Sequence, residues 1–94
     1  MFEAKILDNG GISFSGRLDA SQVEKADNVL TDITTSRTLH FKELEYISSA
    51  GLGILLAHQK RLKEIGHALR LTGLNKHVKD IFTLTGFDNI FEIE

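Results

Sequence analysis

The sequence predicts an α/β sandwich in which helices pack against a mixed, mostly parallel β-sheet. Apolar residues first alternate with polar ones, as in half-buried strands, over two stretches separated by an Asp-Asn-Gly-Gly turn. The apolar spacing then changes to steps of three and four, as in an amphipathic helix. Strand-like and helix-like stretches alternate from there onward, which gives the order β-β-α-β-α-β-α-β. Strands separated by helices favour parallel pairing.

The first two strands form a predicted β-hairpin over residues 2–18. Phe2 and Ile6 fall on one face of the first strand, with charged residues on the other face. The turn at residues 8–11 is rich in residues that tolerate positive φ angles, and alternation resumes at Ile12.

A helix is predicted over residues 18–33, with Asp19 as its N-cap. Ser21 and Glu24 have the spacing of a capping box, in which each side chain bonds the backbone amide of the other residue. One apolar stripe marks the face that packs against the sheet, namely Ala20, Val23, Ala26, Leu30 and Ile33.

The next predicted strand lies within residues 36–47, where Leu39 and Phe41 form a short β-like run. The Ser-Ser-Ala-Gly-Leu-Gly segment that follows predicts the start of a second helix at Ser48 or Ser49. Gly66 predicts the end of this helix. Its inner face is expected to carry Leu52, Leu55, Leu56, Leu62 and Ile65.

The rest of the chain predicts a strand through Leu69 and Leu71, a third helix from Asn75 to about Thr85, and a last strand over residues 89–93. Three phenylalanines in this region are expected in the core, namely Phe82, Phe87 and Phe91.

The composition is that of one small globular domain. The chain has 94 residues, of which 41% are hydrophobic and 26% charged, and this balance argues against disorder. The formal net charge of −2 gives no field that attracts nucleic acid or an anionic membrane surface. The absence of cysteine excludes disulfides and thiolate chemistry. With no leader sequence and no long apolar run, we expect a cytoplasmic protein without direct membrane insertion.

Three motifs of the chain resemble the STAS domains, a family that includes anti-sigma factor antagonists and the tails of sulfate transporters. Ser15–Ala20 (SGRLDA) is similar to the family's Gly-x-Leu-Asp segment. Leu44–Leu56 (LEYISSAGLGILL) is similar to its strand end, serine turn and helix start, and Leu69–Ile93 to its closing strand, helix and strand. The resemblance covers residues 1–94 and implies a single STAS-like (SpoIIaa-like) domain.

The serine turn is the most specific of these matches. In antagonists of this family the turn usually reads Asp-Ser-(Ser/Thr)-Gly-Leu-Gly, and the serine after the Asp is phosphorylated. Aligning Gly51–Gly53 with Gly-Leu-Gly places Ser49 on that serine and Ser48 on the Asp. The resemblance therefore implies phosphorylation of Ser49, with Ser48 as the second choice. Judged by local sequence, both serines are also good helix caps, so capping stays an alternative.

The resemblance implies a non-catalytic switch protein, an anti-sigma factor antagonist, with no cofactor and no metal. Unphosphorylated, it would bind an anti-sigma factor that is also a serine kinase of the GHKL type. Phosphorylation would break the complex, and a serine phosphatase would reset it. The alternative is a STAS-like accessory subunit of a membrane ABC complex for lipid transport, without a phosphoswitch. A monomer is expected. The expected partner-binding residues are Asp19, Ser48, Ser49, Ala50, Gly51, Leu52, Gly53 and His58.

No residue pattern favours an enzyme. Ser49 has no paired base, and its surroundings are not the Gly-x-Ser-x-Gly elbow of hydrolases. The four histidines do not have the spacing of metal ligands. His58 is expected on the polar face of the second helix, either solvated or facing a partner. Asp19 is expected to be an N-cap or a partner contact.

Overall fold

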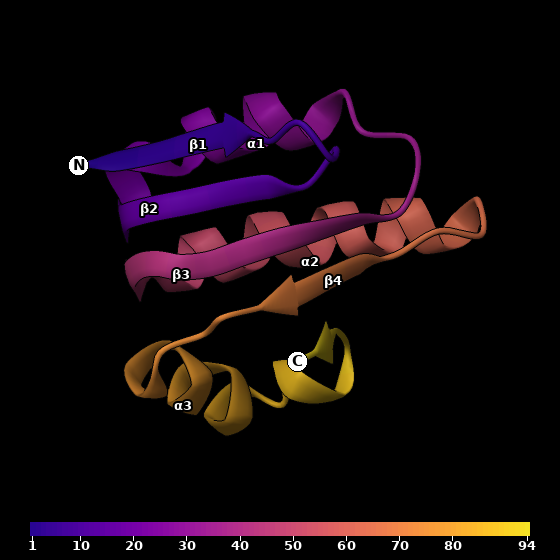
Figure 1. Ribbon diagram of the computed structural model, residues 1–94. Coiled ribbons are helices and arrows are strands. Elements are labelled where there is room, and N and C mark those ends of the chain that lie inside the picture. The colour runs from indigo at the N-terminus through magenta and orange to yellow at the C-terminus, as the bar shows by residue number, and fades with distance from the viewer.

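The sheet has five strands, whose order in space follows their order in the sequence. The computed structural model describes residues 1–94. The first two strands are antiparallel and every later neighbouring pair is parallel, which confirms the predicted sheet (Figure 1). The strands are β1 (Phe2–Ile6), β2 (Ile12–Leu18), β3 (Arg37–Ile47), β4 (Leu69–Thr72) and β5 (Glu92–Ile93).

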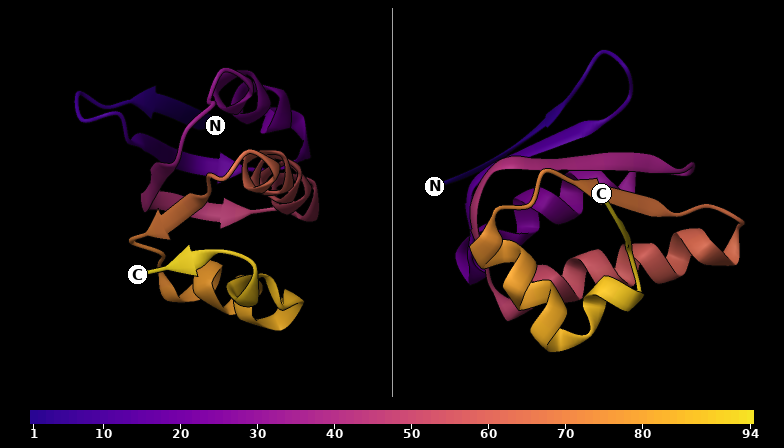
Figure 2. Two further views of the ribbon diagram at one scale, coloured as in Figure 1. Left: turned by 90° about the vertical axis from the view of Figure 1, so that its right-hand side faces the viewer. Right: turned by 60° about the horizontal axis from the view of Figure 1, so that its bottom comes forward.

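All three α-helices cover the same face of the sheet (Figure 2). Each helix connects two neighbouring parallel strands, and right-handed connections between strands in sequential order place every helix on one side. The other face of the sheet carries no helix. None of the helices combines the length and the apolar character needed to cross a membrane. The helices are α1 (Val23–Thr31), α2 (Ser49–Glu64) and α3 (Lys76–Thr85), with 3₁₀ turns at Ala20–Gln22 and Phe87–Asn89.

A row of phenylalanine rings organises the core between the sheet and the helices. Phe2, Phe14 and Phe41 come from three neighbouring strands, and Phe82 comes from α3. Neighbouring ring centroids lie 5.1, 5.5 and 6.3 Å apart along this row. Such ring pairs contribute about 0.5–1.5 kcal/mol each beyond the burial of their area. The row therefore ties the β-hairpin to the C-terminal helix.

β3 is bulged twice against β2. Its inward residues, Leu39, Phe41, Leu44 and Ile47, follow steps of two, three and three instead of strict alternation. The pairing with β2 shifts by one residue at two places. Each extra residue increases the local twist of the strand. The predicted short β-like run at Leu39 and Phe41 is thus only the first part of an 11-residue strand.

The tip of the β-hairpin departs from the prediction for Ile6. Phe2 is buried, but the Ile6 side chain is 66% exposed. The hairpin extends away from the helix layer at this end, so no helix covers its last residues (Figure 2). The expectation that Ile6 shares the buried face of Phe2 is therefore wrong.

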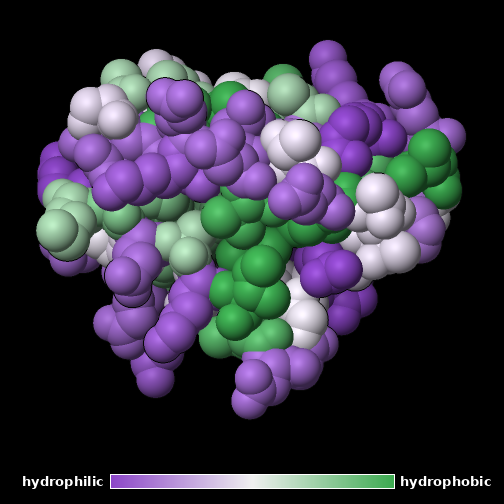
Figure 3. All heavy atoms as spheres, turned by 90° about the horizontal axis from the view of Figure 1, so that it is seen from above, coloured by the Kyte–Doolittle hydropathy of each residue, from purple (hydrophilic) through white to green (hydrophobic).

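From the side of β1 and α1, hydrophobic side chains show as a strip within a largely hydrophilic surface (Figure 3).

The first helix begins differently from the predicted capping box. Asp19 caps a 3₁₀ turn, and the α-helix begins only at Val23, after Gln22, whose side chain makes no capping bond. The Ser21 hydroxyl donates to Asp19 instead of capping an amide near Glu24. The capping box is therefore wrong, because the shorter Asp19–Ser21 contact closes a tight turn first.

α2 ends as predicted, but its inner face differs from the predicted one: Leu56 is only partly buried, Ile65 is exposed, and the polar His58 and Gln59 are buried. Gly66 has φ +84°, and its amide donates to the Lys63 carbonyl, which stops the helix. Ile65 is 55% exposed because it lies at the C-cap, beyond the packed turns, so its predicted burial is wrong. Gln59 is buried on this face, where its side chain accepts from the Leu69 amide and donates to the Ile90 carbonyl.

The last strand is shorter than predicted. Residues Phe87–Asn89 form a 3₁₀ turn, and only Glu92 and Ile93 pair with β4. The turn follows Gly86, which ends α3 as a left-handed residue. Phe91 is buried and Phe87 is partly buried, which agrees with the expectation that both belong to the core.

Candidate functional site

The carboxyl ends of β2 and β3 bring Asp19 and the serine turn together. The two strands are parallel neighbours, and Leu18 is paired with Ile47 at their ends. The Ser48 amide continues this ladder by donating to the Leu18 carbonyl over 2.9 Å. Both motifs predicted from the sequence therefore leave the sheet side by side. The carboxyl end of a parallel sheet is also where α/β proteins commonly bind their ligands.

Ser48 is the N-cap of α2. It has an extended backbone, and its hydroxyl oxygen accepts from the Gly51 amide over 3.1 Å. The Ser48 carbonyl accepts the first α-helical bond, from the Leu52 amide, over 2.9 Å. Ser, Asp and Asn cap helices about equally well, so a serine here satisfies the same amide as an aspartate would.

Ser49 is the first residue of α2, and it is exposed. Its hydroxyl makes no hydrogen bond within the protein, and the amides of Ser49 and Ala50 donate to no acceptor within the protein. These amides lie at the positive end of the helix dipole. The two serines therefore differ in role. Ser48 closes the helix end, and Ser49 presents a hydroxyl to solvent beside unused amides.

The residues after the serines divide between two faces of the helix. A Cβ on Gly51 would lie 3.0 Å from both Ile47 and Leu18, so this glycine allows α2 to pack closely on the sheet. Leu52 is also buried, at 5% exposure. Ala50 and Gly53 are exposed, and a Cβ on Gly53 would meet no atom within 4 Å. The expected contribution of Gly51 and Leu52 to an outer surface is therefore wrong.

Asp19 accepts two hydrogen bonds from Ser21, one from its hydroxyl over 2.7 Å and one from its amide over 3.1 Å. The hydroxyl bond is the main cause that holds the pKa of the Asp19 carboxyl below its ordinary value of 3.8. Like an ordinary carboxyl group, Asp19 is charged at neutral pH, and it lies beside the serine turn. This confirms the N-cap expectation, for a 3₁₀ turn instead of an α-helix.

Removing the Ser21 hydroxyl is expected to raise the pKa of Asp19 towards 3.8, because the main stabiliser of the charged form is lost. The pKa of Asp19 is lower in the folded state than in the unfolded state. Asp19 therefore stabilises the fold fully when the pH is above its unfolded-state pKa, and this stabilisation is lost as the pH falls through its folded-state pKa. Carboxyl ¹³C NMR titrations of wild type and Ser21→Ala measure the difference. Identical midpoints would contradict the role of Ser21.

His58 lies inside the structure instead of on its polar surface, so the sequence expectation is wrong. It is 8% exposed, and its Nε2 lies 2.7 Å from Oδ1 of Asp27 in α1. Arg61 donates to its Nδ1 and also to the carbonyls of Leu30 and Ile33 at the end of α1. Because Arg61 can only donate, Nδ1 of His58 must accept, and Nε2 carries the proton towards Asp27.

His58→Ala is expected to lower the free energy of unfolding by about 1–3 kcal/mol, because it leaves groups of Asp27 and Arg61 without their partner. Lys60→Ala, an exposed change on the same helix, should stay within about 0.5 kcal/mol. Urea unfolding of both variants measures this contrast, and equal midpoints would argue against a structural role for His58.

With the fold and the serine turn established, comparison with known proteins identifies the family. The family model described as "Mlab, STAS domain" matches residues 7–92. This chain belongs to the STAS domain family.

Curated relatives of this STAS domain are named as anti-sigma factor antagonists. BtrV of Bordetella bronchiseptica, assigned to that class, is 35% identical over 74 residues, which make up 79% of this chain and 58% of BtrV. The anti-sigma-B factor antagonist of Bacillus subtilis is 33% identical over 52 residues, 55% of this chain and 48% of that protein. The matched part of this chain thus spans about half the length of these two relatives.

Solved structures show the same fold. An anti-sigma factor antagonist from Mycobacterium paratuberculosis superposes with a TM-score of 0.83 at 18% identity, covering 99% of this chain and 83% of that one. SpoIIAA in its unphosphorylated form gives a TM-score of 0.76 at 19% identity, covering 100% and 88%. At this identity the likeness concerns the fold alone.

The STAS domain also carries an exposed stack that sequence reasoning missed. The guanidinium carbon of Arg17 lies 4.5 Å from the centre of the Tyr46 ring, and the His77 ring stacks near the same tyrosine at 6.3 Å. The three residues come from β2, β3 and α3, so no local motif could reveal the stack. Tyr46 lies two residues before Ser48, which places the stack at the same end of the sheet as the serine turn.

The structure groups no three His, Cys, Asp or Glu side chains in a way that suits a metal ion. The candidate site of this STAS domain is a surface with one free hydroxyl, one carboxylate and unused helix amides, namely Ser49, Asp19 and the first turn of α2.

Proposed function

We propose that this protein is a phosphorylation-controlled anti-sigma factor antagonist. Unphosphorylated, it binds an anti-sigma factor that is also a serine kinase of the GHKL type, through the end of the sheet that carries Asp19 and the serine turn. The kinase phosphorylates Ser49 and the complex separates. A serine phosphatase removes the phosphate and restores binding. The protein itself carries out no catalysis.

The main support for this proposal is that Ser48 and Ser49 have different roles at the start of α2. Ser48 already caps α2, so modification of Ser49 costs the fold no capping bond. The Ser49 hydroxyl is exposed and free to accept a phosphoryl group from a kinase. Ser48, and not Ser49, is the N-cap, which speaks against the reading in which Ser49 is only a helix cap.

The physical consequence of phosphorylation follows from the position of Ser49. A phosphate adds about −1.5 to −2 charges at neutral pH, and the unused amides of Ser49 and Ala50 can donate to it. The modified chain therefore keeps its fold. The added charge lies beside the carboxylate of Asp19 on the outer surface. A partner that fits the unmodified turn would have to strip water from the phosphate, or would bring its own acidic groups against it, and either effect weakens binding.

The proposed contact surface differs from the one expected from the sequence. Three of the residues expected from the sequence to bind the partner are buried, namely Gly51, Leu52 and His58. They position the surface without touching the partner. The exposed stack is added, because Arg and Tyr are enriched where proteins bind each other. The surface then comprises Arg17, Asp19, Tyr46, Ser49, Ala50, Gly53 and His77. Ser48 lies at its edge, with its side chain turned back to the Gly51 amide and away from the partner.

The names of the relatives support the same function. BtrV and the Bacillus protein are both named for antagonism of an anti-sigma factor, and SpoIIAA has been solved in unphosphorylated and phosphorylated forms. The transport-subunit alternative is not favoured, since these names give it no support. It remains an outcome of the experiment below.

The test is capture of partners from the native cell extract with the tagged protein, with and without ATP, followed by intact-mass and peptide mapping of the bait. We expect a serine kinase as the partner and one phosphate, on Ser49. Ser49→Ala should capture the same kinase and hold it when ATP is added. Capture of an ABC-type ATPase with an unmodified Ser49 would overturn the proposal.

A further inference from the structure

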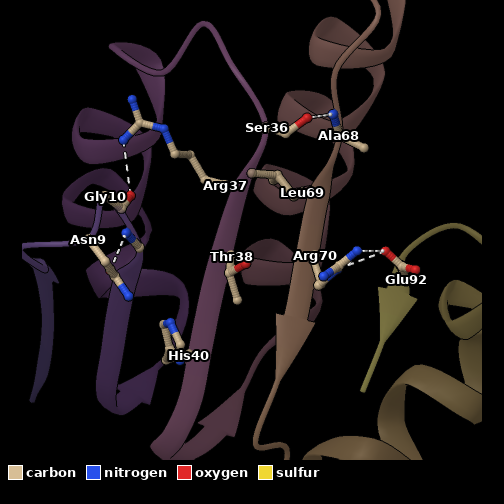
Figure 4. Close-up of a pocket in the computed structure, with 11 residues that line it drawn as sticks. Asn9, Gly10, Ser36, Arg37, Thr38, His40, Ala68, Leu69, Arg70 and Glu92 are labelled. Atoms are coloured by element: carbon tan, nitrogen blue, oxygen red, sulfur yellow. Dashed lines mark hydrogen bonds and ion pairs between the residues drawn. The ribbon is translucent and has the colours of Figure 1, made fainter.

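A polar pocket of about 460 Å³ lies at the end of the sheet opposite to the serine turn. Its walls are the turn of the β-hairpin, the first residues of β3 and β4, and Glu92 of β5 (Figure 4). Because β3 begins at this pocket and ends before Ser48, the two sites lie at opposite ends of this strand. Thr38 and His40 alternate with the buried Leu39, so the pocket opens on the face of the sheet without helices.

Arg37 is held in this pocket without a carboxylate partner. The ion pairs of the chain involve His58, Arg70 and Lys76, but not Arg37. Its Nε donates to the Thr35 hydroxyl and its Nη1 to the Gly10 carbonyl, over 3.2 and 3.0 Å. Two neutral acceptors thus fix the guanidinium, while Nη2 makes no hydrogen bond within the protein. An anion bound there meets a cation that is already ordered, which lowers the entropy cost of binding.

His40 and Thr38 line the floor between the hairpin turn and the neighbouring strand (Figure 4). A Cβ on Gly11 would lie 2.9 Å from Nε2 of His40, so the glycine makes room for the imidazole against the turn. Neither the His40 ring nor the Thr38 hydroxyl makes a hydrogen bond within the protein, although both face the pocket. Both groups can therefore donate to a ligand held by Arg37.

In the half of the pocket formed by β4 and β5, the positive charge of Arg70 is neutralised by nearby carboxylates. Arg70 turns away from Arg37 towards Glu92 (Figure 4). Its Nε and Nη2 both lie 2.8 Å from Oε2 of Glu92, and its Nη1 lies 3.7 Å from Oε1 of Glu94. The excess positive charge is therefore confined to the side of the hairpin turn. A ligand that fills the pocket would place its anionic end near Arg37 and its neutral part over Arg70 and Glu92.

We infer that this pocket binds the oxyanion of a small molecule, a phosphate or a carboxylate, through Arg37, Thr38 and His40. The site is distinct from the serine turn and does not depend on the proposed partner switch. The protein thus has a second binding site, for a small-molecule anion, at the far end of β3.

The test is a ¹⁵N NMR titration of the full chain with inorganic phosphate, and separately with acetate, at constant ionic strength set with sodium chloride. We expect saturating shifts of the amides of Gly10, Gly11, Thr38 and His40, with a dissociation constant of about 1–10 mM for the better anion. The two arms distinguish a phosphate site from a carboxylate site. Non-saturating shifts with both anions would overturn the inference.

Variants separate a built site from general electrostatic attraction. Arg37→Gln should weaken binding about tenfold, because the charge-assisted contact is lost. Lys5→Gln removes the same charge from an exposed residue outside the pocket and should leave binding unchanged. Thr38→Val keeps Arg37 and its contacts with the turn, and should weaken binding about threefold. Equal weakening by Arg37→Gln and Lys5→Gln would contradict the inference.

Discussion

A Ser49→Asp variant is expected to fold as the wild type does and to bind the kinase about 10–100 times more weakly. This corresponds to a cost of about 1.4–2.7 kcal/mol for a like or desolvated charge at the interface. The Ser49 hydroxyl makes no hydrogen bond within the protein, so the change removes no side-chain hydrogen bond. The carboxylate extends from the outer side of the first helical turn, where the partner binds. Circular dichroism and calorimetric titration of the captured kinase measure the two effects.

Ser48→Asp is the matched control, because it adds the same charge one residue away. The Ser48 side chain turns back to the Gly51 amide, and an aspartate there caps the helix in the same way. Its charge is directed at the helix end instead of at the partner, so binding should stay within about threefold of wild type. If both variants bind like wild type, or both lose binding alike, the position of Ser49 is not what controls the partner.

A Gly16→Ala variant is expected to lose about 2–4 kcal/mol of unfolding free energy. Gly16 has φ +85°, and a Cβ there would lie 2.0 Å from the Met1 carbonyl oxygen, which is backbone. That oxygen also accepts from the Arg17 amide over 2.8 Å, so relief of the clash breaks a bond of the hairpin. This explains physically why glycine stands in the SGRLDA motif.

Gly53→Ala is the matched control for this change. It is also a glycine-to-alanine substitution, but in the open face of α2, where the new methyl group meets no atom within 4 Å. Alanine favours the helix over glycine, so this variant should gain about 0.5–1 kcal/mol. Urea unfolding measures both variants. A Gly16→Ala midpoint at or above that of wild type would contradict the steric account.

The features that could be predicted from the sequence are those set by neighbours in the chain. The hairpin turn, the start of α2 at the serine turn and its end at Gly66 each depend on a few consecutive residues with particular backbone needs. The family motifs add the strand order and the place of Ser49. These local signals are consistent with one another, which is why the order of elements is right.

The features that could not be predicted depend on contacts between distant segments. His58 is polar and lies beside Lys60, so only the approach of Asp27 from α1 explains its burial. The bulges of β3 arise from its pairing with β2, and the stack on Tyr46 joins three elements. Local spacing also favoured a Ser21–Glu24 box over the shorter Asp19–Ser21 bond. In each case tertiary packing decides the outcome.

The most direct test of the proposed switch is the affinity of one protein sample for its kinase in three states, measured by calorimetric titration. The states are the unmodified protein, the same protein phosphorylated on Ser49, and the protein after treatment with a serine phosphatase. The proposal predicts that affinity falls about 100-fold or more on phosphorylation and returns fully after dephosphorylation, with an unchanged circular dichroism spectrum throughout. Equal affinity in all three states would contradict it.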